Sequence, residues 1–340
     1  MLAKKNALLV AAFALAVCAI AAVYLRPALA DIHYGASYFP NVALTTQDGA
    51  TVHFYDDLLK GKIVAIDLIY THCEYACPLE TARLAQVQHL LGDRVGKDIF
   101  FYSISIDPER DSPQVLKEYA EKFHAGPGWL FLTGKKSDID LISKKLGLYS
   151  DPDPSDKDGH TPSLLVGNEA TGQWMRNSAL DNPKFMAITI GNWLAGWKST
   201  ALTSGKSYAE APSIDLSDRG KYVFATHCAA CHTVNRGDAI GPDLAGVTKL
   251  RTHDWLLRYV ERPDLVLAAK DPIATELFAK YKQVRMPNLN LPEADVSAVL
   301  AFLDHQPANP AAAPTPASTP QHDARPATPQ SAASPPPPSQ

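Results

Sequence analysis

Residues 35–197 alternate short apolar runs with helix-like segments, and this alternation limits what the chain can fold into. Apolar runs of this length, rich in β-formers, are typical of buried strands, and their alternation with helices predicts an α/β layer architecture. Ser112-Pro113 has the form of an N-cap followed by the first residue of a helix. The expected strands are Ile63–Tyr70, Ile99–Ile106, Trp129–Leu132 and Ser163–Gly167, and Asn182–Trp197 is expected to be helical.

The 340 residues, of which 46% are hydrophobic, can fill two cores. The segment 215–305 has helical periodicity at both ends and few strand signals, so it predicts an all-α second domain. The Pro- and Ala-rich segment 306–340 contains no large apolar residue and is expected to be disordered. We therefore divide the chain into an N-terminal segment 1–30, an α/β domain 31–198, a linker 199–214, an all-α domain 215–305 and a tail 306–340.

The N-terminal segment predicts export. Lys4 and Lys5 precede an uncharged run, residues 6–25, which as a helix is about 30 Å long and can cross the hydrocarbon core. Basic residues before such a run predict a cytoplasmic N-terminus and an exported remainder. Cleavage after Ala28-Leu29-Ala30 and lipidation of Cys18 are the competing interpretations, and both also export the rest of the chain. We expect a transmembrane anchor and a location on the periplasmic side of the bacterial inner membrane.

Charge and cysteine usage narrow the function. The net charge is −4 and no Lys/Arg block occurs beyond the N-terminus, so no nucleic-acid partner is expected. Outside the N-terminal segment the cysteines form two close pairs, Cys73/Cys77 and Cys228/Cys231. Two pairs are too few for a disulfide scaffold of this size. Each pair therefore needs its own chemical explanation.

The second pair lies in Cys228-Ala229-Ala230-Cys231-His232, the attachment pattern of c-type haem. Two thiols one helical turn apart can add to the two vinyl groups, and the adjacent imidazole can reach the iron. A redox C-x-x-C followed by a chance histidine is the alternative. The pattern predicts one covalent haem c bound through Cys228 and Cys231, with His232 as an axial ligand.

The second axial ligand is expected further along the chain. Met286 precedes the final helical segment and is the only methionine of residues 215–305. His253 and His227 are weaker candidates. A His/Met pair raises the haem potential and suits electron transfer.

Residues 215–305 resemble the class I cytochrome c domains. The resemblance rests on Gly220-x-x-x-Phe224, the CAACH pattern, Gly241-Pro242-Asp243-Leu244 and the Met286 loop before a closing helix. It implies that the Pro242 carbonyl accepts a hydrogen bond from His232. A purely loop-shaping proline is the alternative.

Cys73 and Cys77 lie in Thr71-His72-Cys73-Glu74-Tyr75-Ala76-Cys77-Pro78, between a buried strand and an expected helix start. A disulfide closing so short a loop removes little chain entropy, and reduced buried thiols are unusual in an exported protein. The positive end of a helix favours thiolate, which is the form that binds metal and attacks disulfides. A redox-active dithiol and a metal site both stay open. His72, His124 and His160 are the histidines that could complete a metal site.

Residues 35–197 are similar to the SCO/SenC family of membrane-anchored, thioredoxin-like proteins. The resemblance rests on YTHCEYACP (70–78), SISIDPERDSP (103–113), FLTG (131–134) and the loop that carries His160. It implies a thioredoxin-like fold, copper bound by Cys73, Cys77 and His160, and a role in assembling the copper centre of cytochrome c oxidase. Asp107, Arg110 and Asp111 read as turn and helix-cap residues, or as supports of the copper loop.

Three functions follow as hypotheses. The first is a copper-binding assembly factor whose fused haem domain supplies or accepts electrons; its expected partners are the copper-site subunit of cytochrome c oxidase and other periplasmic copper chaperones or redox proteins. The second is a thiol–disulfide reductase that prepares the cysteines of the oxidase copper site. The third is a membrane-anchored electron-transfer cytochrome with a docking domain. Haem and copper each change by one electron and a disulfide by two, which favours the first over a classical enzyme.

Overall fold

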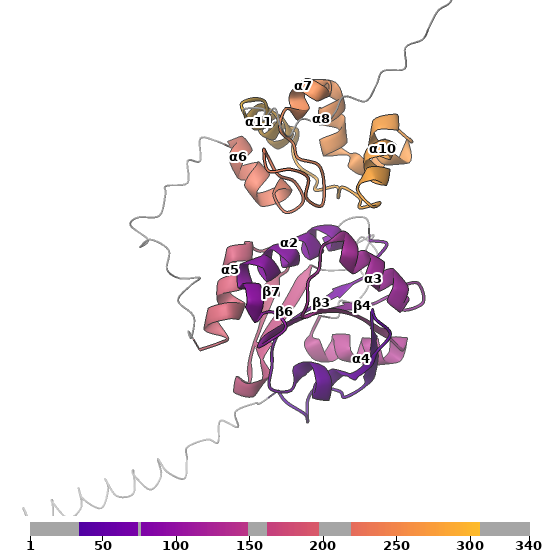
Figure 1. The fold of residues 1–340 in the computed structure, drawn as a ribbon, viewed down its shortest axis with the longest axis vertical. Coiled ribbons are helices and arrows are strands. Elements are labelled where there is room, and N and C mark those ends of the chain that lie inside the picture. The colour runs from indigo at the N-terminus through magenta and orange to yellow at the C-terminus, as the bar shows by residue number, and fades with distance from the viewer. Residues whose placement is uncertain (1–33, 74–75, 149–161, 197–218, 307–340) are drawn as a thin grey trace, which may run out of the picture.

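The computed structural model describes residues 34–73, 76–148, 162–196 and 219–306. These residues form an α/β unit and a smaller helical unit that lies over helices α2 and α3 of the first (Figure 1). The predicted anchor at residues 6–25, the linker 199–214 and the tail beyond residue 306 lie outside the described ranges. The described part contains no helix with the length and hydropathy needed to span a membrane.

One seven-stranded sheet, in the order β2-β1-β5-β4-β3-β6-β7, organises the described part of the α/β unit. Its centre is parallel: β3 pairs with β4 and β4 with β5, while β6 and β1 join them antiparallel. All seven residues of β3 are buried, as expected of a central strand that is apolar except for Asp67. The strands are β1 (Ala43–Thr46), β2 (Thr51–His53), β3 (Ile63–Ile69), β4 (Ile99–Ser105), β5 (Trp129–Gly134), β6 (Ser163–Asn168) and β7 (Gln173–Ser178).

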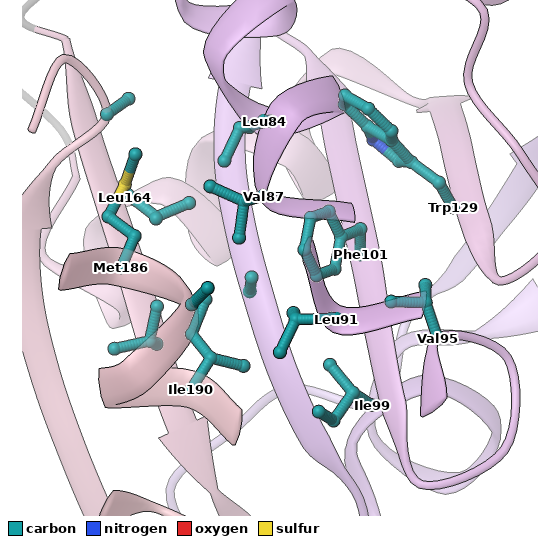
Figure 2. Close-up of a cluster of buried hydrophobic side chains, with 14 of the residues drawn as sticks. Leu84, Val87, Leu91, Val95, Ile99, Phe101, Trp129, Leu164, Met186 and Ile190 are labelled. Atoms are coloured by element: carbon teal, nitrogen blue, oxygen red, sulfur yellow. The ribbon is translucent and has the colours of Figure 1, made fainter. Parts of the chain in front are cut away.

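Helices cover both faces of this sheet. One core lies between the sheet and α2 (Ala76–Leu91), α3 (Pro113–Lys122) and α5 (Pro183–Ile188), and Figure 2 shows its side chains. The other core lies under α4 (Lys136–Leu146) and the π-helical turn η1 (Phe54–Leu59). The remaining short helical turns of this unit are η2 (Gly92–Arg94), η3 (Glu169–Thr171) and η4 (Thr189–Trp193).

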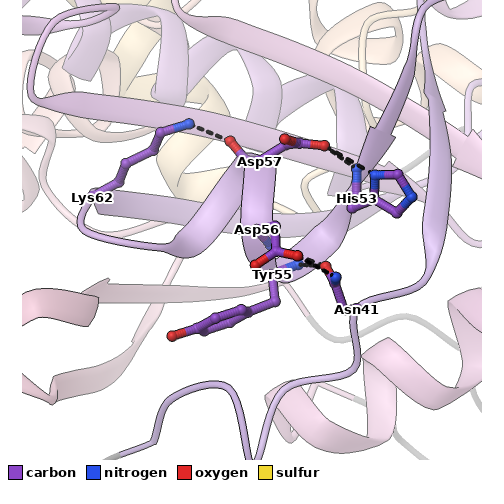
Figure 3. A network of polar contacts seen from close by, with 6 residues as sticks. All are labelled: Asn41, His53, Tyr55, Asp56, Asp57 and Lys62. Carbon is purple, nitrogen blue, oxygen red and sulfur yellow. Dashed lines mark hydrogen bonds and ion pairs between the residues drawn. The ribbon is translucent and has the colours of Figure 1, made fainter.

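Polar contacts fix η1 at the rim of the sheet (Figure 3). The Asn41 side-chain oxygen accepts from the backbone N–H groups of Tyr55 (3.1 Å) and Asp56 (3.0 Å), two of the donors that a helix start leaves unpaired. Asp57 accepts from the backbone N–H of His53 at 2.6 Å, and Lys62 donates to the Asp57 carbonyl. These contacts hold η1 against β2.

The helical unit packs around a close crossing of its first and last helices. α6 (Arg219–Val223) crosses α11 (Glu293–Asp304) at Gly220, where an added Cβ would lie 2.1 Å from the Ala298 carbonyl oxygen. Glycine is therefore needed there for the helices to touch. The other elements are η6 (Phe224–Cys228), α7 (Val247–Leu250), α8 (His253–Glu261), α9 (Pro263–Ala268) and α10 (Pro272–Lys280).

Most of the expected elements are confirmed. The four predicted strands are β3 to β6, and Ser112 caps α3 by accepting from the Val115 N–H at 3.4 Å. The segment 182–197 is helical through α5 and η4 as far as Trp193. Strands β1, β2 and β7 were not predicted, because they are short, carry polar residues and lie at or near the sheet edges.

Candidate haem and metal sites

The predicted haem ligands meet in one cavity of the helical unit. Cys228, Cys231, His232 and Met286 all line it. The cavity opens to solvent, and its empty volume is about 990 Å³ including the open mouth. One lining residue, Leu79, comes from α2 of the other unit. The residue set fits a c-type haem, with two thiols, an imidazole and a thioether in one apolar space.

His232 is held in the orientation and tautomer that an axial ligand needs. Its Nδ1 donates to the Pro242 carbonyl at 2.9 Å, as the cytochrome c resemblance implies, and this leaves Nε2 unprotonated in the neutral ring. Burial lowers the pKa of His232, which favours the neutral form. A Cβ at Gly241 would lie 2.7 Å from the His232 ring, so glycine is needed beside it.

The chain around the attachment motif is fixed by Asp243, whose role the sequence did not reveal. Burial raises the pKa of Asp243, but the hydrogen bonds it accepts outweigh this and lower the pKa to about 2. The ionised carboxylate thus pairs backbone N–H groups of a loop in which no helix or strand would pair them. Its donors are the backbone N–H groups of Asn235, Arg236, Gly237 and Ala245 and the hydroxyl of Thr233.

The structure places two of the three candidates for the second axial ligand at the cavity. Met286 and His227 both line the cavity, whereas His253 has a side chain that is 68% exposed at the start of α8. Cys228 ends the π-helical turn η6, a conformation found often at functional sites. Met286 stays the predicted second axial ligand.

Cys73 and Cys77 lie together where β3 leads into α2. Both are buried and in the thiol state, and the Cys77 N–H lies 3.4 Å from Cys73 Sγ. The hydrogen bond with Cys73, followed by burial, raises the pKa of Cys77 well above its usual value. Cys77 is the second residue of α2, and in the metal-free protein its contact with Cys73 and its burial oppose the expected effect of the helix N-terminus on its pKa.

The loop before Cys73 is tied to the neighbouring strand. Asp111, which is fully buried, accepts from the Thr71 hydroxyl at 2.6 Å, the Thr71 N–H at 3.1 Å and the Ser105 hydroxyl at 2.6 Å. Arg110 Nη1 donates to His72 Nε2 at 3.0 Å. The segment 107–111 thus supports the cysteine loop, and His72 is engaged with that segment.

Two buried carboxyls near the cysteines were missed by sequence reasoning. Asp67 lies in β3 and accepts from the Ser103 hydroxyl at 2.7 Å, and burial raises its pKa to about 7. Glu80 lies in α2, and burial, then Asp67 and Cys73, raise its pKa well above the usual value. A charged residue within an otherwise apolar strand was the only available signal for Asp67.

His160 lies outside the described ranges, and within those ranges no three His, Cys, Asp or Glu residues are grouped as a metal site. His124 is exposed and follows α3 in the left-handed conformation (φ 57°), as expected of a residue that ends a helix. The described structure therefore brings Cys73 and Cys77 together, and the third copper ligand stays a prediction.

A second cavity opens beside Cys73. Its empty volume is about 370 Å³ including open solvent. One wall comes from the α/β unit and includes His72 and Cys73, and the other comes from the helical unit. The residues of the second wall are Gln283, Val284 and Arg285, directly before Met286.

These features define a thioredoxin-like α/β domain with a buried cysteine pair, joined to a helical cytochrome c domain. Two family models match the chain: SCO1/SenC over residues 34–186 and Cytochrome c over residues 217–307. The chain belongs to the SCO1/SenC family and carries a cytochrome c domain after the family domain.

The relatives are similar over the first domain. The SCO2-like protein of Rickettsia felis is 32% identical over 147 residues, which are 41% of this chain and 70% of the relative. The SCO1 protein homolog of Bacillus subtilis is 35% identical over 126 residues, which are 36% of this chain and 64% of that relative. A SCO1/SenC family lipoprotein structure from Bacillus anthracis is 27% identical and covers 46% of this chain and 94% of that one, with a TM-score of 0.40.

Proposed function

We propose that this protein is a copper-binding assembly factor that delivers copper to the copper-site subunit of a cytochrome c oxidase. The observation that carries the proposal is the pair of buried thiols, Cys73 and Cys77, side by side where β3 meets α2 in a SCO1/SenC domain. Copper favours thiolate and imidazole ligands, and His160 is the imidazole that the family resemblance supplies. Copper is the cargo of this reaction.

Binding requires both thiols to lose their protons. Because the Cys73 contact and burial keep Cys77 protonated in the metal-free protein, copper uptake releases protons and strengthens as the pH rises. The loop that carries the first thiol is already fixed through Thr71 and Asp111. The chain therefore holds part of the ligand set in place before the metal arrives.

The second domain adds redox chemistry. In this proposal Cys228 and Cys231 hold one haem c covalently, and His232 and Met286 are its axial ligands. When bound, the haem supplies one-electron transfer, which matches the one-electron change of copper. His232 keeps its Nδ1 proton on the Pro242 carbonyl, and the apolar cavity limits water.

The proposed location is the periplasmic side of a bacterial inner membrane, with residues 6–25 as anchor. The uncharged run and the preceding lysines support this location. Other periplasmic copper chaperones or redox proteins are the proposed further partners. None of the site residues named above lies within the proposed anchor.

The test compares copper binding by the full chain with that of two variants. Cys77→Ser and His160→Ala should each lower copper affinity by more than about 100-fold, since each removes a ligand. His124→Ala is the matched control, because His124 is exposed and ends α3. Isothermal titration with Cu(I) and Cu(II) gives the affinity, and oxidase assembly in cells gives the function. Unchanged binding in both ligand variants would refute the proposal.

Dithiol reduction of the oxidase cysteines is the second candidate, favoured by the 3.4 Å contact of the Cys77 N–H with Cys73 Sγ, which shows that the two residues meet. The same variants separate the two functions. A reductase keeps oxidase assembly in His160→Ala and loses it in Cys77→Ser. A copper donor loses assembly in both.

A further inference from the structure

Helix α2 contacts the cytochrome c domain through two side chains one turn apart. Arg83 donates from Nη2 to the Thr226 carbonyl, and Gln86 donates from Nε2 to the Ala229 carbonyl at 2.9 Å. Residues at positions i and i+3 share one side of a helix. Both acceptors lie at the haem attachment motif, so this side of α2 holds the motif's backbone.

Apolar contacts join the same surfaces. Residues of the cytochrome c domain that line its haem cavity pack against the core of the α/β domain, and Leu79 of α2 lines that cavity in return. The contact is therefore made by the side of the cytochrome c domain on which its haem cavity opens, here called the haem edge. The packing residues of that domain are Cys231, Ile240 and Val284, which line the haem cavity, and Ala230 of the attachment motif, which does not.

The docked domain also covers the cysteine site. Gln283, Val284 and Arg285 form the far wall of the cavity that contains Cys73. Val284 and Arg285 line the haem cavity as well, so a single stretch of chain separates the two sites. This stretch leads directly to the predicted axial ligand Met286.

We propose that α2 is a docking surface for the chain's own cytochrome c domain, and that the docked domain closes the Cys73 cavity to protein partners while a metal ion can still enter. The cavity is only about 370 Å³, including open solvent. A specific protein–protein contact needs about 800 Å² of surface from each partner, and the segment 283–285 occupies part of that surface.

Two states of the chain follow. Two hydrogen bonds and a few apolar side chains make a contact that can open, and because both domains belong to one chain the contact forms again at high effective concentration. Metal enters the docked state, and copper passes to the oxidase subunit in the undocked state. This last consequence rests on the proposed function, whereas the closure does not.

Thiol accessibility in the copper-free holoprotein tests the closure. Cys73 and Cys77 are modified with iodoacetamide and, separately, with a 5-kDa polyethylene glycol maleimide, on a Cys18→Ser background. Gln86→Glu replaces the donor to the Ala229 carbonyl with an acceptor and so opposes docking. The ratio of the large-probe rate to the small-probe rate should rise about five- to tenfold in Gln86→Glu.

Gln173→Glu is the matched control. It makes the same chemical change on β7, where the side chain accepts from the Thr171 hydroxyl and a carboxylate can do so too. General unfolding speeds up modification by both reagents, so a change in the ratio alone reports how well the large reagent reaches the cysteines. An equal ratio in wild type and Gln86→Glu, or an equal rise in Gln173→Glu, would overturn the closure. Because no copper is present, either result is independent of the copper-binding test.

Discussion

Asp67 shows how one buried side chain sets a property of the whole α/β domain. Only one of its oxygens, Oδ1, has a hydrogen-bond partner within the described residues, the Ser103 hydroxyl. Ser103 also accepts from the Trp129 indole N–H at 2.9 Å, so the three side chains form a short buried chain across β3, β4 and β5. Burial raises the pKa of this carboxyl to about 7, so it stays largely protonated in mildly acidic solution.

We expect Asp67→Asn to stabilise the protein at pH 8. The pKa of Asp67 is raised to about 7, and an unfolded carboxyl titrates near 3.9, so the free energy of unfolding falls by about 3 kcal/mol as the pH rises from 4 to 7. Asparagine still accepts from Ser103 and never ionises, so the variant should not lose stability over this pH range. Urea unfolding at several pH values measures the free energy of unfolding of both proteins.

The exposed Asp93, with a 99% exposed side chain, is the control for this test, and Asp93→Asn should keep the wild-type pH profile. If Asp67→Asn shows the same fall in stability between pH 4 and 7 as wild type, Asp67 is not the group responsible. Glu80 is then the next candidate, because its pKa is raised in the same direction.

At the residue scale, the sequence predicts groups whose chemistry demands a local spacing. Cys228, Cys231 and His232 are recognisable because covalent attachment and axial ligation fix their separation along the chain. Glu80 and Asp243 carry no such spacing. Their roles depend on burial and on backbone donors that only the folded chain brings together.

Elements are predictable where their residues repeat a clear pattern. β3 and β4 are mostly apolar and rich in β-formers, and α3 begins at a Ser-Pro pair, so all three were predicted. The outer strands β2 and β7 have exposed and half-buried residues and rely on a neighbouring strand for their conformation. The beginning of α2 at Ala76, ahead of the expected Pro78, brings Cys77 into the helix.

The close crossing of α6 and α11 predicts that a side chain at Gly220 will destabilise the cytochrome c domain. Gly220→Ala should destabilise the cytochrome c domain by about 2–3 kcal/mol, because the added methyl would lie 2.1 Å from the Ala298 carbonyl oxygen and 2.7 Å from Phe302 Cβ. Helix propensity alone predicts the opposite sign, a gain of about 1 kcal/mol. Thermal unfolding followed at the haem Soret band measures the change.

Lys221→Ala serves as the control for Gly220→Ala, since it alters the next residue of α6 at an exposed position. It should change the melting temperature little. A Gly220→Ala protein that melts at or above the wild-type temperature would contradict the close crossing of the two helices.

At the scale of the whole molecule, the two domains could be recognised separately but their docking could not. The contacts run from Arg83 and Gln86 to backbone carbonyls, and a carbonyl has no sequence identity that a pattern could reveal. The cavity beside Cys73 likewise needs walls from segments more than 200 residues apart. Only the folded chain shows that the haem edge, rather than another face, meets α2.

Docking predicts an electrostatic effect across the interface. Burial raises the pKa of Cys231 in the haem-free chain, and the charge of Arg83 opposes this, so the guanidinium acts at the haem attachment motif. A nearby cation disfavours the more positive oxidised haem. Arg83→Gln should therefore lower the haem midpoint potential, on the order of tens of millivolts. Glutamine is two bonds too short to reach the Thr226 carbonyl, so the variant removes this hydrogen bond together with the charge.

Spectroelectrochemical titration of the full chain measures this potential. Arg94→Gln is the control, because it removes the same charge from η2, where Arg94 pairs with Asp98 in the α/β domain. Arg83 is only 7% exposed, so salt should screen its effect weakly, and the shift should persist at high ionic strength. A shift of equal size in both variants, or none in Arg83→Gln, would mean that the domains are not docked in solution as described. A shift in Arg83→Gln alone places the guanidinium of one domain at the redox centre of the other.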